Sequence, residues 1–168
     1  MTKLMIVEDD IALREIYSIR MTAEGYNVVV AGDGEEALAV AVREKPDIIL
    51  SDVMMPKISG FDMLDILRAT PETASIKIVM MTALSSEEQR ARGEALGADR
   101  YLVKSQVGIE DVVNVIHEVL GDKGQAPTTD STPAVTPSFA ASATQFSTST
   151  PNAQNSGIPN AGPTTYNY

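Results

Sequence analysis

Five short apolar runs divide the first 122 residues of the chain. They occupy residues 4–7, 28–31, 48–50, 76–81 and 101–103, and most are continuous rather than alternating. Continuous runs of this length are typical of strands that are buried on both faces, as in a parallel sheet covered by helices. The pattern therefore predicts five buried strands.

Residues at helical spacing follow each of these runs. Ser85 and Glu88 have the spacing of a capping box before the fourth predicted helix, which Gly97 would end. Five alternating strand and helix units predict an α/β fold, a doubly wound parallel sheet with right-handed crossovers and helices on both faces. The residues at helical spacing in the other four helices are Leu13, Ile16, Tyr17, Arg20 and Met21; Ala37, Leu38, Ala41 and Val42; Phe61, Met63, Leu64, Ile66 and Leu67; and Val112, Val113, Ile116, Val119 and Leu120.

Acidic, hydroxyl and basic residues stand at the ends of the predicted strands, where a doubly wound sheet carries its site. Glu8 and Asp9 follow the first strand, Asp52 the third, Thr82 the fourth and Lys104 the fifth. A cluster of carboxylates favours a hard divalent cation such as Mg²⁺. Lys104 and Thr82 can bind phosphoryl oxygens, and a carboxylate held beside them can form an aspartyl phosphate.

Each of these residues also has a purely structural interpretation. Asp9 or Asp10 could cap the following helix, and capping is the preferred interpretation for Asp10. An aspartate after a strand is often a turn residue, and Lys104 could be a solvated surface lysine. The joint occurrence of these residue types at one edge of the sheet favours the functional interpretation.

The composition limits the classes of partner. Residues 1–122 carry 12 Lys/Arg against 22 Asp/Glu, a net charge of −10, which argues against direct nucleic-acid binding. The absence of cysteine excludes disulfides and thiolate metal sites. With no apolar run near 20 residues and no signal-peptide pattern at the N-terminus, a cytoplasmic location and no membrane association are expected.

Residues 123–168 differ in composition from the rest of the chain. This segment is rich in Thr, Ser, Pro, Ala and Asn, and its only charged residues are Lys123 and Asp130. Such a segment buries too little apolar surface to offset the entropy of ordering. We therefore predict a folded domain at residues 1–122 and a disordered tail at residues 123–168, with no output domain.

Four stretches of the sequence resemble the receiver domain of bacterial response regulators, in order and at that family's spacing. They read "LMIVEDD" at residues 4–10, "DIILSDVMMPKISGFDML" at residues 47–64, "MTA" at residues 81–83 and "GADRYLVK" at residues 97–104. The resemblance covers about residues 1–121. It implies a flavodoxin-like sheet of strand order 2-1-3-4-5 flanked by five helices.

The resemblance also implies a role for individual residues. Asp52 would be the phosphoacceptor, with Lys104 on the phosphoryl group and Thr82 and Tyr101 as the switch pair. The ligands of Mg²⁺ (or Mn²⁺) would be Glu8, Asp9, Asp52 and the backbone carbonyl of Met54. The implied partners are a histidine kinase or histidine phosphotransfer protein and a downstream protein target. The chain would be a stand-alone receiver that catalyses only its own phosphorylation and dephosphorylation.

The loops around the site raise three further expectations. The family usually has proline after the conserved lysine, often with a cis bond, whereas this chain has Ser105, so the loop geometry there is open. Gly60 is expected to take a positive φ. Met54 and Leu84 stand two residues after Asp52 and Thr82, where they either hinder the water that would attack the phosphoryl group or only pack against the loop.

Three other functions remain as alternatives. An Mg²⁺-dependent phosphatase would need a second acid two residues after its nucleophile, where this chain has Met54. A flavin or nucleotide carrier would need a Gly/Ser/Thr-rich phosphate loop in place of residues 8–10. A phosphorylation-independent scaffold would leave the retained Asp, Thr and Lys unexplained.

Overall fold

A parallel five-stranded sheet forms the centre of the computed structural model, which describes residues 1–121. Its strands lie in the order β2-β1-β3-β4-β5, and each neighbouring pair is parallel, which confirms the predicted topology. No helix within residues 1–121 is long and apolar enough to cross a membrane. The elements are β1 Lys3–Val7, α1 Ile11–Ala23, β2 Asn27–Ala31, α2 Gly34–Glu44, β3 Ile48–Asp52, α3 Gly60–Ala69, β4 Lys77–Thr82, α4 Glu87–Ala95, β5 Arg100–Val103 and α5 Ile109–Leu120.

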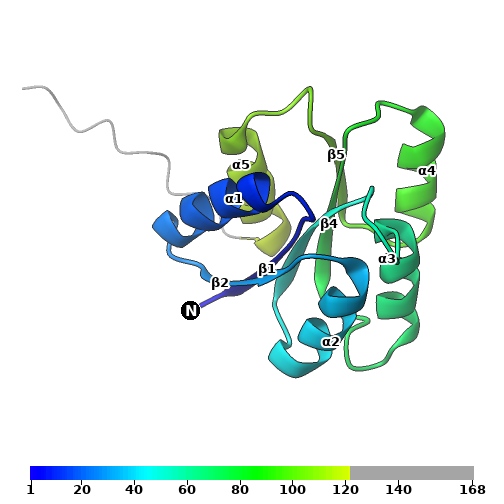
Figure 1. The fold of residues 1–168 in the computed structure, drawn as a ribbon, viewed down its shortest axis with the longest axis horizontal. Helices are drawn as coiled ribbons and strands as arrows, with labels where there is room; N and C mark the ends of the chain where they lie inside the picture. Colours follow the sequence, from blue (N-terminus) through cyan, green and yellow to red (C-terminus); the bar gives the residue numbers. More distant parts are fainter. Residues whose placement is uncertain (122–168) are drawn as a thin grey trace, which may run out of the picture. The chain divides into compact units, whose positions relative to one another are not determined.

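The continuous apolar runs are explained by two hydrophobic cores, one on each face of the sheet. Successive side chains of a strand point to opposite faces, so Leu4 and Ile6 enter one core while Met5 and Val7 enter the other. Helices α1 and α5 cover the first core, and α2 and α3 cover the second (Figure 1). Both faces of the central strands are therefore buried, which explains why their apolar runs are continuous.

Polar side chains begin three of the helices. The Asp10 carboxylate accepts from the Leu13 N–H at 3.0 Å, which confirms Asp10 as the cap of α1. Asp33 caps α2 in the same way, and Ser59 caps α3. These caps satisfy N–H groups that have no partner within the helix. The caps therefore fix where α1, α2 and α3 begin after the preceding strands.

Three residues expected on the helix stripes are exposed. Ile16 of α1, Val42 of α2 and Ile66 of α3 are 52%, 49% and 42% exposed, so these residues share the helical spacing of the stripes without being buried. A helix that packs on one face of a sheet buries a single stripe, and these residues lie at its border or beyond. In α2, Val40 is buried instead of Val42, with 5% of its surface exposed.

Helix α4 is polar, and Gly93 is its one buried residue. It begins at Ser86 without a side-chain cap, so the capping box expected at Ser85 is not formed. Helices α1, α2, α3 and α5, by contrast, bury larger apolar side chains such as Met21 and Ile116. Helix α4 is therefore held by fewer hydrophobic contacts than the other helices.

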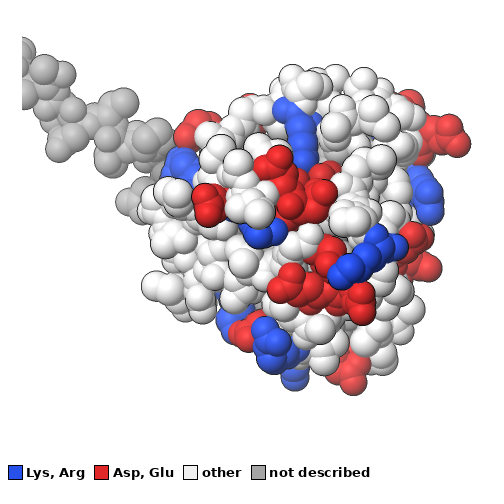
Figure 2. Space-filling model, viewed as in Figure 1, with Lys and Arg blue, Asp and Glu red and all other residues white. Residues whose placement is uncertain are grey.

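Charged residues cover much of the described surface. Acidic side chains gather over the middle of the face seen in Figure 2, with lysines and arginines between and around them. The tail predicted at residues 123–168 lies outside the described residues. Its disorder and the domain boundary at residue 122 therefore stay predictions.

Candidate functional site

The carboxyl ends of four strands bring the predicted site residues together. Asp52 is the last residue of β3 and Thr82 the last of β4, while Glu8 follows β1 and Lys104 follows β5. The site spans these strands because β3 pairs with β1 on one side and with β4 on the other. The strand order thus brings the ends of β1 and β5 to one edge of the sheet, where the Lys104 side chain reaches Glu8, 96 positions away in the sequence.

Three carboxylates form the acidic part of this site. One oxygen from each of Glu8, Asp9 and Asp52 lies within 4.8 Å of the others. Glu8 and Asp52 are only 1% and 5% exposed, whereas Asp9 is exposed. The cluster is therefore buried on the sheet side and open to solvent at Asp9, as a site that admits an ion or a ligand requires.

Lys104 is the positive charge of the site. Its Nζ donates to Glu8 Oε2 at 2.7 Å and to Asp52 Oδ2 at 3.0 Å. No cis peptide bond occurs in the described chain, so the bond from Lys104 to Ser105 is trans. Lys104 reaches the acidic cluster with serine in place of the family's usual proline, because β5 itself aims the side chain.

Burial and hydrogen bonds together set the pKa values of Glu8 and Lys104. Burial raises the pKa of the Glu8 carboxyl, and the nearby charge of Asp52 adds to this, although the hydrogen bond from Lys104 acts in the opposite direction. Burial opposes a charged Lys104, but its hydrogen bonds to Glu8 and Asp52 outweigh that effect and raise its pKa. Lys104 therefore stays protonated, and this one cation contacts two of the three carboxylates, those of Glu8 and Asp52.

The loop from β3 to α3 is held tightly against Asp52. The Met54 N–H donates to Asp52 Oδ1 at 3.2 Å, so the Met54 peptide lies at the site, and its carbonyl as a metal ligand stays a prediction. Gly60 does not have a positive φ, so that expectation was wrong. A Cβ on Gly60 would lie 2.3 Å from the Asp52 carbonyl oxygen, so glycine is needed for close approach. Lys57 takes the left-handed conformation instead, with φ of 66°.

The Thr82 hydroxyl points to helix α4 rather than to the acidic cluster. Thr82 is fully buried, and its Oγ1 accepts from the Leu84 N–H at 3.1 Å and donates to Gln89 Oε1 at 3.5 Å. The Tyr101 hydroxyl donates to the same Gln89 oxygen at 3.4 Å. The two residues of the expected switch pair therefore share one acceptor.

The Tyr101 ring is packed between two other elements. It stacks on Phe61 with ring centroids 6.3 Å apart, and a Cβ on Gly93 would lie 2.9 Å from its edge. Tyr101 is 6% exposed, so the ring is already buried here. The role of Tyr101 as the partner of Thr82 in a switch stays a prediction.

Two residues near the site had no signal in the sequence. Gln89 lies seven positions after Thr82, in a polar helix without a recognisable motif. Arg14 donates from Nη1 to the Glu8 carbonyl at 2.9 Å and so braces the turn that carries the acidic pair. Only its place one turn after the Asp10 cap could have suggested that contact.

The side chains of Met54 and Leu84 lie at the surface around the site. They are 56% and 49% exposed. This degree of exposure does not fit residues that only pack against the loop. Their effect on the lifetime of a phosphoryl group stays a prediction.

Three comparisons with known proteins agree on the family. The profile of the response regulator receiver domain matches residues 4–117. The probable transcriptional regulator ycf27 of Porphyridium aerugineum is 40% identical over 102 residues, which are 61% of this chain and 41% of that protein. The DNA-binding dual master transcriptional regulator RpaA of Synechocystis is 39% identical over 104 residues, 62% of this chain and 43% of RpaA. The chain thus spans less than half of these relatives.

Solved structures show the same fold over nearly their whole length. The chemotaxis protein CheY4 of Vibrio cholerae has a TM-score of 0.67 and 35% identity, and the match covers 71% of this chain and 98% of CheY4. The receiver domain of the Francisella response regulator 1452 has a TM-score of 0.67 and 27% identity, with coverages of 72% and 98%. The matched profile spans more than half of the chain, and the fold and the residues at the strand ends agree with it. This chain therefore belongs to the response regulator receiver family of two-component signalling proteins.

Proposed function

We propose that this receiver accepts a phosphoryl group on Asp52 and thereby changes its affinity for a protein partner. The carrying observation is the carboxylate of Asp52, which lies with Glu8 and Asp9 in one acidic cluster and receives Lys104 at 3.0 Å. A buried carboxylate at the end of a central strand, with a fixed cation beside it, supports the role of nucleophile toward a transferring phosphoryl group.

The donor set fits a hard divalent cation. Three carboxylates face a single lysine, and like charges this close repel one another unless a cation or protons intervene. Glu8, Asp9 and Asp52, with the backbone carbonyl of Met54, would hold Mg²⁺ or Mn²⁺, since oxygen ligands are those that such ions prefer. The ion supplies charge neutralisation to the phosphoryl oxygens when bound.

The transfer itself needs only one bond to form and one to break. An oxygen of Asp52 bonds to phosphorus while the bond from phosphorus to the imidazole nitrogen of a phosphohistidine breaks, and the electron pair stays on the imidazole. Lys104 keeps its proton and holds a phosphoryl oxygen as a fixed positive charge. Thr82 offers its hydroxyl to another phosphoryl oxygen after leaving Gln89. The receiver is catalytic only toward its own phosphorylation and dephosphorylation.

An exposed apolar surface beside the site supports a protein as phosphodonor. Ile11 and Ile19 of α1 are 64% and 72% exposed, and α1 begins two residues after Asp9. Exposed apolar side chains grouped on one element often mark protein contact surfaces. The proposed donor is a histidine kinase or a histidine phosphotransfer protein, and the proposed readout is contact with a downstream protein.

We further propose that the receiver makes no direct contact with nucleic acid. RpaA, one of the relatives, is by name a DNA-binding regulator, but this chain covers only 43% of its length. The acidic balance of residues 1–122 makes this part a poor ligand for phosphate backbones. The prediction of no direct nucleic-acid contact by the receiver, and of action as a stand-alone module, stays a prediction.

Intact mass after incubation with Mg²⁺ and acetyl phosphate tests the proposal. Wild type should gain one phosphoryl group and lose that gain when EDTA is present. Asp52→Asn should gain none, because the amide is not a nucleophile. Asp47→Asn is the matched control: it makes the same substitution just before β3, at the end opposite Asp52, and should gain the group as wild type does.

Each other outcome has a distinct meaning. A phosphoryl gain in Asp52→Asn would place the acceptor elsewhere and refute the assignment. No gain in wild type, either from acetyl phosphate or from a phosphohistidine donor, would favour phosphorylation-independent binding instead.

A further inference from the structure

One side-chain oxygen of helix α4 contacts both hydroxyl groups of the switch pair. Gln89 Oε1 lies 3.5 Å from Thr82 Oγ1 and 3.4 Å from the Tyr101 hydroxyl oxygen. Both distances are long for hydrogen bonds between oxygens, so each contact is weak and easily exchanged. Weak contacts that a stronger acceptor can replace are suited to a switch.

The Thr82 hydroxyl has only one hydrogen to give. It already accepts from the Leu84 N–H, and its single hydrogen is directed to Gln89. A phosphoryl oxygen on Asp52 would compete for that same hydrogen, and a charged acceptor is stronger than an amide carbonyl. Phosphorylation would therefore take Thr82 away from Gln89 and leave Gln89 with Tyr101 alone.

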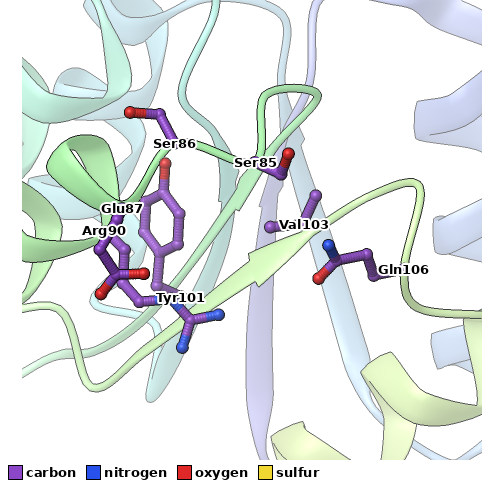
Figure 3. A pocket seen from close by; sticks show the side chains of 7 residues that line it. All are labelled: Ser85, Ser86, Glu87, Arg90, Tyr101, Val103 and Gln106. Atoms are coloured by element: carbon purple, nitrogen blue, oxygen red, sulfur yellow. The ribbon is translucent and has the colours of Figure 1, made fainter.

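The same face of α4 also seats the ring of Tyr101. Gly93 lies one turn after Gln89 and contacts the ring edge, where a Cβ would come within 2.9 Å. Gly93 is the only buried residue of this helix, so α4 has little other apolar contact to hold it in place. Figure 3 shows the Tyr101 ring beside α4, with its hydroxyl directed toward Ser86. The Gln106 side chain lies next to Val103, away from that hydroxyl. A change at Gln89 would thus act on Tyr101 and on α4 together.

We propose that Gln89 is the positioning residue that couples the Thr82 hydroxyl to Tyr101 and to helix α4. In the unphosphorylated state Gln89 Oε1 accepts a hydrogen bond from each of the two hydroxyls. When Asp52 is phosphorylated, Thr82 leaves this contact, and the change in hydrogen bonding alters the surface of α4. This inference rests on the proposed function for its trigger, but the coupling itself exists without a phosphoryl group.

A mutant cycle in the unphosphorylated protein tests the coupling directly. The readout is the ring signal of Tyr101 in the tyrosine-labelled chain of 168 residues, assigned by its loss in Tyr101→Phe. Thr82→Val removes the hydroxyl and should shift this signal in an otherwise wild-type chain, because Gln89 is released. In a Gln89→Met chain the same Thr82→Val change should leave the Tyr101 signal in place, since the shared acceptor is gone.

Gln106→Met is the matched control. Gln106 lines the same pocket of about 130 Å³ as Tyr101 and undergoes the same change of side chain, but none of the hydrogen bonds found within residues 1–121 joins it to either hydroxyl. In the Gln106→Met chain, Thr82→Val should shift the Tyr101 signal as in wild type. The inference is overturned if Thr82→Val leaves Tyr101 unmoved in wild type, or moves it equally in Gln89→Met.

Beryllofluoride, an analogue of the phosphoryl group, tests the same coupling in the loaded state. Gln89→Met leaves the buried Thr82 hydroxyl without its acceptor, and the analogue restores one, so its apparent affinity in the presence of Mg²⁺ should rise about five-fold. That gain should vanish in the Thr82→Val background and be absent in Gln106→Met. Equal affinities for wild type and Gln89→Met would count against the inference. If neither wild type nor any variant bound the analogue, the result would count against the proposed function. The mutant cycle in the unphosphorylated protein would still decide whether Gln89 couples Thr82 to Tyr101.

Discussion

At the scale of single residues, the site depends on the close approach of Gly60, at the start of α3, to the end of β3. Gly60 lies against the Asp52 carbonyl, and its N–H donates to the Val53 carbonyl at 2.9 Å. The absent side chain lets α3 begin directly beside the end of β3. The role of this glycine is steric, because its φ lies in the ordinary range.

Gly60→Ala should therefore destabilise the fold as well as the site. The new Cβ would meet the Asp52 carbonyl oxygen at 2.3 Å and the Val53 Cα at 2.9 Å, and neither backbone atom can move without displacing β3. We expect a loss of about 3 kcal/mol in the free energy of unfolding, measured by urea denaturation. Gly108→Ala is the control, since its Cβ would meet only Asp111 at 3.5 Å, and it should lose at most about 1 kcal/mol. Equal losses in the two variants would show that steric contact is not the reason for Gly60.

At the scale of elements, an ion pair links the loop after β3 to the start of α2. Lys57, in the left-handed conformation, donates to Asp33 Oδ2 at 2.7 Å, while the same carboxylate caps α2 by accepting from the Glu36 N–H at 2.9 Å. The hydrogen bond from the Glu36 backbone and then that from Lys57 lower the pKa of Asp33 from its usual 3.8. One carboxylate thus fixes both the helix start and the loop that carries the site.

This arrangement predicts the sign of a pH dependence. A carboxyl whose pKa is lower in the folded state stabilises the fold above its unfolded pKa, and the contribution is lost as the pH falls through the folded value. Asp33→Asn keeps the cap but removes the charge. Wild type should be the more stable of the two near neutral pH, and the difference should shrink below the unfolded value of 3.8. Unfolding midpoints in urea between about pH 6 and pH 3 would show this. A difference that stays constant across that range would contradict it.

At the scale of the whole molecule, the fold concentrates negative charge at one end of its sheet. The chain has a net charge of −10, and Glu8 and Asp52 are buried together with a single lysine. Burial of like charges opposes folding unless a cation or protons compensate. The stability of the receiver should therefore depend on divalent cations.

Mg²⁺ should raise the thermal midpoint of unfolding, because an ion that binds only the folded state stabilises it by mass action. At about ten times the dissociation constant the expected rise is about 5 °C. Asp9→Asn should remove most of this rise, whereas Asp10→Asn keeps the α1 cap and should retain it. Calorimetry with and without Mg²⁺ distinguishes the two adjacent carboxylates. An equal rise in both variants would exclude Asp9 from the cation site.

The fold and most of the site were accessible from the sequence, because both depend on local patterns. Continuous apolar runs indicated strands buried on both faces, which holds for β1, β3 and β4 but not for the edge strand β2, where Val30 is 44% exposed. A parallel sheet brings the carboxyl ends of its strands to one edge. Glu8, Asp52 and Lys104 were therefore identified by their position directly after such runs. The helix stripes were less reliable, since Val42 and Val40 are both apolar and only packing shows which of the two is buried.

Only the tertiary structure decided the contacts between elements, because no sequence pattern predicts those contacts. The shared contact of Gln89 with Thr82 and Tyr101 depends on how α4 lies over β5, and the polar sequence of α4 has no apolar stripe to set that position. The trans bond at Ser105 and the steric role of Gly60 likewise follow from backbone paths. The sequence determines which residues reach the carboxyl edge of the sheet because strand burial is a local property of side chains. Only the folded structure determines which groups meet there, because contact distance depends on the packing of every neighbouring element.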